Sequence, residues 1–97
     1  MIFLKIADLR KGQGKINIEV EVISVGEIRE FQKFDRQGKV ATAVVKDDSG
    51  EINLTLWNED IDKVSAGSKI KIENGYVNEF QGEPQLTAGK FGKLIVL

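Results

Sequence analysis

The side chains best suited to chemistry in this sequence are aromatic, and three of them occur in two short motifs. The segment GYVNEFQG, residues 75–82, carries Tyr76 and Phe80 between two glycines, and the only tryptophan, Trp57, ends the segment EINLTLW. The flat face of an aromatic ring stacks on other flat groups, and each stacked nucleic-acid base contributes about 1–3 kcal/mol. We therefore expect a binding surface that is built from rings.

The sequence offers few of the residue types that catalysis or metal binding requires. The 97 residues include no histidine and no cysteine, which excludes imidazole general bases, Ser-His-Asp and Cys-His nucleophiles, disulfides and most transition-metal sites. The acidic pair Asp47–Asp48 lies in a DDSG turn, where aspartate is favoured because it bonds to nearby backbone. The sequence has neither a phosphate loop nor the spacing of a calcium loop. We predict that the protein is not an enzyme and uses no cofactor or metal.

A segment rich in cations, between residues 27 and 39, provides a second candidate contact. Its basic residues alternate with two rings and with three acidic residues. The candidate binding residues in it are Arg29, Phe31, Lys33, Phe34, Arg36 and Lys39. In a mobile loop, such cations hold phosphates while the rings offer stacking surfaces; the alternative is a solvated hairpin loop of mixed charge. Because the net charge of the chain is −1, we expect only modest affinity for a polyanion.

Length and composition indicate one ordinary globular domain over residues 1–97. Hydrophobic residues make up 41% and charged residues 30%, and no apolar run approaches the roughly 20 residues that a membrane-spanning helix needs. Lys5 and Asp8 interrupt the first apolar stretch too early for a signal peptide. The sequence ends in the strand-like KLIVL, which favours excision from a longer chain.

The elements that must position these residues are mostly strands, because the hydrophobic period is two over most of the chain. In order, we predict a strand over 15–31, a polar loop over 32–39, strands over 40–46 and 51–57 joined by a turn, a helix within 58–67, a strand over 68–80 and two strand pieces within 85–97. Gly26 is expected to bend or bulge the long first strand, and Asn58 to cap the helix. This order predicts an all-β fold, a five-stranded Greek-key OB-fold barrel with one short helix between strands three and four.

The strand over 68–80 contains a conflict of parity that decides where two of the rings point. Ile72 faces the core, and strict alternation would send Tyr76 inward with it. A bulge at Asn74–Gly75 would reverse the register, bury Val77 and turn Tyr76 and Phe80 outward. We predict this bulge; the alternative is that the rings complete the core.

Trp57 has the parity of the polar side of its own strand. It alternates with the apolar residues of EINLTLW and is expected on the outer surface with Thr55. Small residues such as Thr42, Thr55 and Thr87 would let a flat partner approach the rings. A cluster of exposed rings marks a contact site, because it lowers solubility unless a partner covers it.

The run DDSGEINLTLWNEDIDKVSAGSKIKIENGYVNEFQGEPQLTAG, residues 47–89, resembles the single-stranded-DNA-binding OB domain of archaeal single-stranded-DNA-binding proteins and replication protein A. It is also similar to the small human single-stranded-DNA-binding proteins of the sensor-of-single-strand complex. The matching motifs are the D-x-x-G turn, LTLW, the segment AGSKIKIENGY, the EFQG turn and QLTAG. With IADLRKGQGKINIEVEVISV at the front, the resemblance covers nearly the whole chain.

The resemblance implies an OB barrel that binds single-stranded nucleic acid across one face. Aromatic residues at the positions of Trp57, Tyr76 and Phe80 would stack on bases, while Arg29 and the loop after it would contact the strand. Some relatives carry a further aromatic residue where Thr87 stands here, so this chain is expected to bind more weakly or over a shorter footprint. Nothing in the resemblance supplies a catalytic group, a metal or a nucleotide cofactor.

The expected function is sequence-tolerant binding of single-stranded DNA in replication, repair or recombination. Two alternatives share the fold: a protein-interaction subunit of a replication-protein-A-like complex, which would have other subunits or OB domains as partners, and an RNA-binding domain. We expect a cytoplasmic protein, archaeal or nucleoid-associated, without contact to a membrane.

Overall fold

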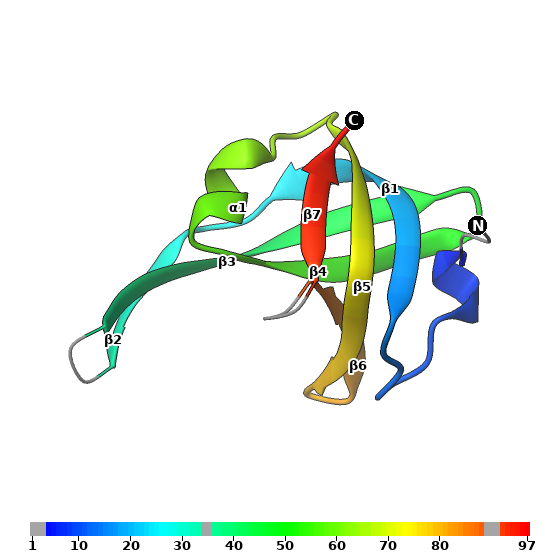
Figure 1. Cartoon of the computed structure of the whole chain (residues 1–97), viewed down its shortest axis with the longest axis horizontal. Coiled ribbons are helices and arrows are strands. Elements are labelled where there is room, and N and C mark those ends of the chain that lie inside the picture. Colours follow the sequence, from blue (N-terminus) through cyan, green and yellow to red (C-terminus); the bar gives the residue numbers. More distant parts are fainter. Residues whose placement is uncertain (1–3, 34–35, 89–91) are drawn as a thin grey trace.

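The computed structural model describes residues 4–33, 36–88 and 92–97, and Figure 1 shows their arrangement. The strands are β1 (Ile16–Val25), β2 (Arg29–Lys33), β3 (Arg36–Asp47), β4 (Gly50–Trp57), β5 (Lys69–Phe80), β6 (Glu83–Thr87) and β7 (Lys93–Val96). A 3-10 helix, η1 (Ile6–Asp8), precedes β1, and the single-turn helix α1 (Glu59–Lys63) connects β4 to β5.

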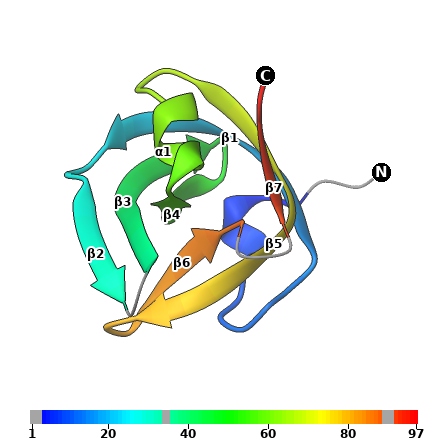
Figure 2. The same cartoon turned by 60° about the vertical axis from the view of Figure 1, so that its left-hand side comes forward.

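The strands close into a barrel. They pair in the order β1-β3-β4-β6-β5-β7, and β1 also pairs with β5, which completes the ring visible in Figure 2. The β4–β6 pairing is parallel and the others are antiparallel. The predicted all-β barrel of five strands is confirmed: β1 with β2 makes the predicted first strand, β6 with β7 makes the last, and the helix follows strand three.

Alternate residues of the strands fill the barrel, as the period of two predicts. The buried apolar side chains of β1 and β4 are Ile16, Ile18, Val20, Val22, Ile52, Leu54 and Leu56. Ile61 of α1 and Val64, which follows it, are buried as well. Each such burial stabilises the fold by about 1.5–3 kcal/mol, so the core fixes which side of every strand faces outward.

The predicted long first strand is bent, and its bulge lies earlier than expected. The β1–β3 register shifts between Val22 and Ser24, so the extra residue is Ile23 and not Gly26. The strand is interrupted after Val25, where the Gly26 N–H donates to the Thr42 carbonyl over 2.8 Å. A Cβ at Gly26 would lie 2.7 Å from that oxygen, so glycine allows a close approach of two backbones.

The predicted polar loop over 32–39 is wrong for most of its length. Its described residues continue β2 and begin β3, which form an antiparallel hairpin that projects from the barrel in Figure 1. Glu30 lies opposite Lys39, and opposite charges across a ladder favour pairing. Mixed charge therefore marked an exposed hairpin and not an irregular loop. Phe34 lies outside the described residues.

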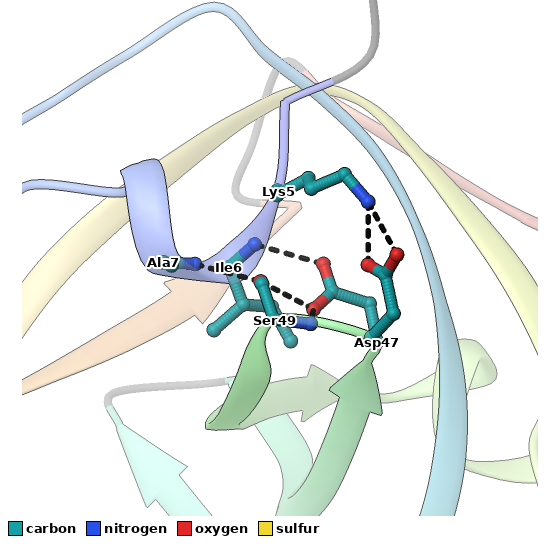
Figure 3. Close-up of polar contacts among 6 residues, drawn as sticks. Lys5, Ile6, Ala7, Asp47 and Ser49 are labelled. Atoms are coloured by element: carbon teal, nitrogen blue, oxygen red, sulfur yellow. Dashed lines mark hydrogen bonds and ion pairs between the residues drawn. The ribbon is translucent and has the colours of Figure 1, made fainter.

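Side chains of the β3–β4 turn hold the segment that precedes β1 (Figure 3). One carboxylate oxygen of Asp47 accepts from the backbone N–H of Ile6 over 2.8 Å, and the other accepts from the Ser49 N–H over 2.7 Å. The Ser49 hydroxyl accepts from the Ala7 N–H over 3.0 Å, and the Lys5 ammonium reaches Asp48 at 2.5 Å. The prediction that the DDSG aspartates bond to backbone is confirmed for Asp47.

These contacts shift the pKa values of Asp47 and Lys5. Burial would raise the pKa of the Asp47 carboxyl, but hydrogen bonds from the Ser49 hydroxyl and from the N–H groups of Ile6, Ser49 and Gly50 outweigh it, so the pKa lies below its ordinary value. The hydrogen bond to Asp48 raises the pKa of Lys5. Both carboxylates therefore serve the junction between η1 and the turn.

Candidate nucleic-acid interface

The predicted bulge in β5 is confirmed and turns Tyr76 outward. Ile18 of β1 pairs with Ile72, whereas Ile16 pairs with Gly75, so β5 carries one extra residue between the two pairs. Beyond the bulge, Val77 is fully buried and Tyr76 is 42% exposed. The positive φ of the bulge, 55°, belongs to Asn74 and not to Gly75.

A tight hairpin sets the register of the next strand. Gln81 and Gly82, which join β5 to β6, both have positive φ, the conformation of a type I′ turn. Tyr76 therefore pairs with Thr87, and Asn78 pairs with Gln85. Phe80 pairs through its backbone with Glu83 at the end of the ladder; its side chain lies outside the described part.

Four strands present their polar sides on one outer face. Thr42 of β3 pairs with Thr55 of β4, which pairs with Thr87 of β6, so three threonines cross the face side by side. A groove of about 600 Å³ runs over them. Residues that line it include Arg29, Thr42, Thr55, Trp57, Asn78, Gln85 and Thr87.

Trp57, the last residue of β4, lines this groove and contacts the ring of Phe31. The ring centroids are 5.9 Å apart and the planes meet at 84°, an edge-to-face arrangement. Both side chains keep an open surface, with 43% of Trp57 and 38% of Phe31 exposed. Among the described residues this is the one pair of rings in contact. The ring that contacts Trp57 therefore comes from the β2–β3 hairpin and not from β5.

The end of β4 is fixed to β3 beside this ring pair. The Asn58 N–H donates to the Lys39 carbonyl over 2.9 Å, and the Lys39 N–H donates to Asn58 Oδ1 over 3.0 Å. The prediction that the Asn58 side chain caps the helix is wrong, because no cap bond forms and its oxygen is used by Lys39. These two hydrogen bonds fix the backbone at the end of β4, next to Trp57.

Tyr76 forms a second, separate aromatic position. It lies on β5, two strands from Trp57 on β4 with β6 between them, a lateral separation of roughly 10 Å. Its neighbour is Gly14, where an added Cβ would be 3.6 Å from Tyr76 Cδ2. Trp57 and Tyr76 both lie on the outside of the barrel, as expected, but they lie apart, with Thr55 and Thr87 between them.

The predicted cations are divided between the groove and other surfaces. Arg29 lines the groove together with the carboxylates of Glu27 and Glu79, and Lys11 pairs with Glu79 at 3.3 Å. Lys39 lines a different hollow, of about 570 Å³, with Glu30 and acidic residues of α1. Lys33 and Arg36 pair through their backbones at the far end of the hairpin.

Sequence reasoning did not select two amide side chains in the groove. Asn78 is exposed, and Gln85, opposite it, accepts a hydrogen bond from the Thr55 hydroxyl over 3.3 Å. The signal was present in the EFQG turn, because a two-residue hairpin fixes the register of the residues on both sides. These groups give the space between Trp57 and Tyr76 a floor that can form hydrogen bonds.

Other types of site have little support in the part of the chain that the structure describes. No group of three or more acidic, histidine or cysteine side chains there is placed to hold a metal ion. No helix in the same part combines the length and apolar character needed to cross a membrane.

The family model of the OB-fold nucleic acid binding domain matches residues 16–94. The chain belongs to this family. This OB-fold domain is 31% identical over 90 residues to the single-stranded DNA binding protein Ssb of Saccharolobus solfataricus, an alignment that covers 93% of the chain and 61% of that protein. It is 43% identical over 72 residues to Replication factor A of Methanothermobacter thermautotrophicus; this alignment covers 72% of the chain and 9% of that protein.

Solved structures of the OB-fold family agree with the barrel. The second OB-fold domain of replication protein A from Methanococcus maripaludis superposes with a TM-score of 0.79 at 26% identity, covering 99% of this chain and 95% of that one. The predicted similarity to archaeal single-stranded-DNA-binding and replication factor A proteins is therefore confirmed, as is the OB fold.

Proposed function

We propose that this OB-fold domain binds single-stranded DNA in replication, repair or recombination, by stacking bases at two positions on its outer face. The observation that carries the proposal is Trp57: its side chain is 43% exposed, it lines the groove, and its backbone is held by the Asn58–Lys39 hydrogen bonds. Tyr76 provides the second position, and Phe80, three residues beyond the buried Val77, is the expected third. The similarity to the single-stranded DNA binding protein Ssb supports the same function.

Stacking, not phosphate attraction, supplies most of the affinity in this proposal. The described groove holds one cation, Arg29, against the carboxylates of Glu27 and Glu79. Each stacked base contributes about 1–3 kcal/mol, so two or three rings suffice for binding at the chain's net charge of −1. The remaining cations, Lys33, Arg36 and Lys39, assist from the hairpin.

Binding without catalysis fits the roles of the acidic residues. Asp47 and Asp48 hold the segment before β1, and the carboxylates Glu59, Asp60 and Asp62 lie in the single turn of α1. None of these arrangements pairs a nucleophile with a base.

Fluorescence of Trp57 tests the proposal directly. A single strand of oligodeoxythymidine should quench the emission saturably at low salt, since an unpaired base can stack on the indole. Duplex DNA of the same length should quench far less, because both faces of its bases are already stacked. Equal quenching by both, or none by either, would remove base stacking as the function.

A second candidate is assembly with other OB domains or subunits of a replication-protein-A-like complex. It is favoured by the length of the relatives, since the segment that matches this chain makes up 9% of Replication factor A. RNA binding uses the same chemistry. Titrating DNA and RNA of one sequence side by side, with the quenching assay, separates RNA binding from DNA binding.

A further inference from the structure

At Gly38 a neighbouring side chain occupies the place that a Cβ would take, whereas its backbone φ is one that other residues can adopt. The described glycines with positive φ are Gly12, Gly67 and Gly82. A Cβ at Gly38, by contrast, would lie 2.8 Å from both Cε atoms of Phe31 and closer still to its Cζ. Phe31 and Gly38 are direct partners in the β2–β3 ladder, so the phenyl ring lies across the strand where a side chain would otherwise stand.

From this place the Phe31 ring reaches Trp57. The centroid distance of 5.9 Å and the interplanar angle of 84° are those of a favourable edge-to-face pair. The Asn58–Lys39 hydrogen bonds already hold the backbone at the end of β4. What remains free is the rotation of the indole about its side-chain bonds, and Phe31 is the aromatic neighbour that restricts it.

We propose that Gly38 is a positioning residue for base stacking: it seats Phe31, and Phe31 orients Trp57 before the strand binds. This inference rests on the proposed function and gives Phe31 a different role from the one expected for it, because the ring supports the indole instead of stacking on a base of its own. Orientation in the free protein matters because a side chain that is already ordered loses less entropy when a ligand arrives.

The proposal can be tested with Gly38→Ala because the barrel should tolerate this change. The atoms that an added methyl group would displace belong to the outer end of the Phe31 ring, which can rotate away, and not to backbone. Gly50→Ala is the matched control: Gly50 lies at the other end of β4, its φ is not positive, and an added Cβ would make an ordinary contact of 3.9 Å with Ile6. Phe31→Leu provides a second test variant.

The first readout is the rotation of Trp57 in the free protein, measured as time-resolved fluorescence anisotropy. Gly38→Ala and Phe31→Leu should increase the amplitude of fast local motion, and Gly50→Ala should leave it unchanged. This measurement needs no ligand, so it stands even if the domain binds no DNA. Unchanged motion in both test variants would overturn the proposal.

The second readout is affinity for a labelled oligodeoxythymidine of roughly a dozen nucleotides, within the site size of one OB domain. Gly38→Ala and Phe31→Leu should each weaken binding about three- to tenfold, the scale of one aromatic pair. In a Trp57→Ala background the same changes should have no further effect, because Phe31 acts through the indole. A full further loss in that background would show that Phe31 contacts the DNA itself, and would overturn the proposal while leaving the proposed function intact.

Discussion

Gly75 pairs with Ile16 across the β1–β5 ladder, although the pairing of Ile72 with Ile18 two residues away would bring Asn74 to that position. The extra residue reverses the parity of β5. As a result Val77 enters the core and Tyr76 reaches the outer face. The exposed aromatic surface of β5 therefore depends on one bulge in the barrel wall.

Replacing Gly75 by valine should destabilise the fold by about 1–3 kcal/mol, the usual cost of overpacking a core. The reason is space, because an added Cβ would lie 2.8 Å from Ile72 Cγ2 and 3.0 Å from the Thr87 carbonyl oxygen. Asn74→Gly is the control; glycine adopts a positive φ of 55° without steric cost, so this change should destabilise the fold less than Gly75→Val does. Urea denaturation measures both. Wild-type stability in the valine variant would mean that the bulge yields easily.

The bulge illustrates what the sequence could predict. The alternation of apolar and polar residues located the strands. Ile72 and Val77 can both face the core only if the strand contains an extra residue between them, and this requirement located the bulge. The backbone conformation of the bulge could be predicted only in part. The sequence does not show which residue of Asn74–Gly75 has positive φ: the chain places it at Asn74 and uses the glycine for a close approach between strands.

Contacts between strands far apart in sequence could not be read in the same way. Phe31 was a candidate because of the cations around it, yet its contact with Trp57 depends on the β2–β3 register that brings it opposite Gly38. The side-chain oxygen of Asn58 goes to Lys39, a residue that local helix-capping rules do not consider. Pairwise geometry of this kind follows from the closed barrel.

Asp47 should make the stability of the domain depend on pH in the acid range. Its folded pKa lies below the ordinary value, so its stabilising effect is complete above the unfolded pKa of about 3.9 and is lost as the pH falls through the folded pKa. Asp47→Asn should lower stability by about 1–2 kcal/mol at neutral pH and flatten this acid loss. Thermal melts between pH 7 and the acid range test it. An Asp47→Asn variant that keeps the wild-type acid slope would contradict this assignment.

Salt dependence should distinguish the cation of the groove from a cation of the hairpin. If about three phosphates are contacted, the logarithm of the binding constant should fall against the logarithm of salt with a slope near −2, at roughly −0.7 per contact. Arg29→Ala should flatten the slope by most of one contact, because Arg29 lines the groove. Lys39→Ala should flatten it less, since Lys39 lines the hollow beside α1. Titrations at several salt concentrations decide, and salt-independent binding would exclude phosphate contacts.

Tyr76 and Trp57 should contribute to binding independently. The strands that carry them, β4 and β5, are separated by β6, a lateral distance of roughly 10 Å, and distant substitutions usually add within a few tenths of a kcal/mol. The loss of binding free energy in the double variant Trp57→Ala with Tyr76→Ala should therefore equal the sum of the single losses, measured with a labelled oligonucleotide. Strong coupling between the two would indicate that one base contacts both rings.

Trp57→Ala and Leu56→Ala, which alter neighbouring residues of β4, should have opposite effects. Trp57 is 43% exposed on the outer face, whereas Leu56 is 1% exposed in the core. Removing the indole should weaken binding of single-stranded DNA by about 1–3 kcal/mol and lower stability by no more than its edge-to-face contact with Phe31, about 1 kcal/mol. Truncating Leu56 should cost about 2–5 kcal/mol of stability, because it leaves a cavity, while the molecules that remain folded bind with near wild-type affinity. Denaturation curves and oligonucleotide titrations on both variants provide the comparison. If Trp57→Ala unfolds the domain as Leu56→Ala does, then the indole belongs to the core and the outer face has lost its principal stacking group.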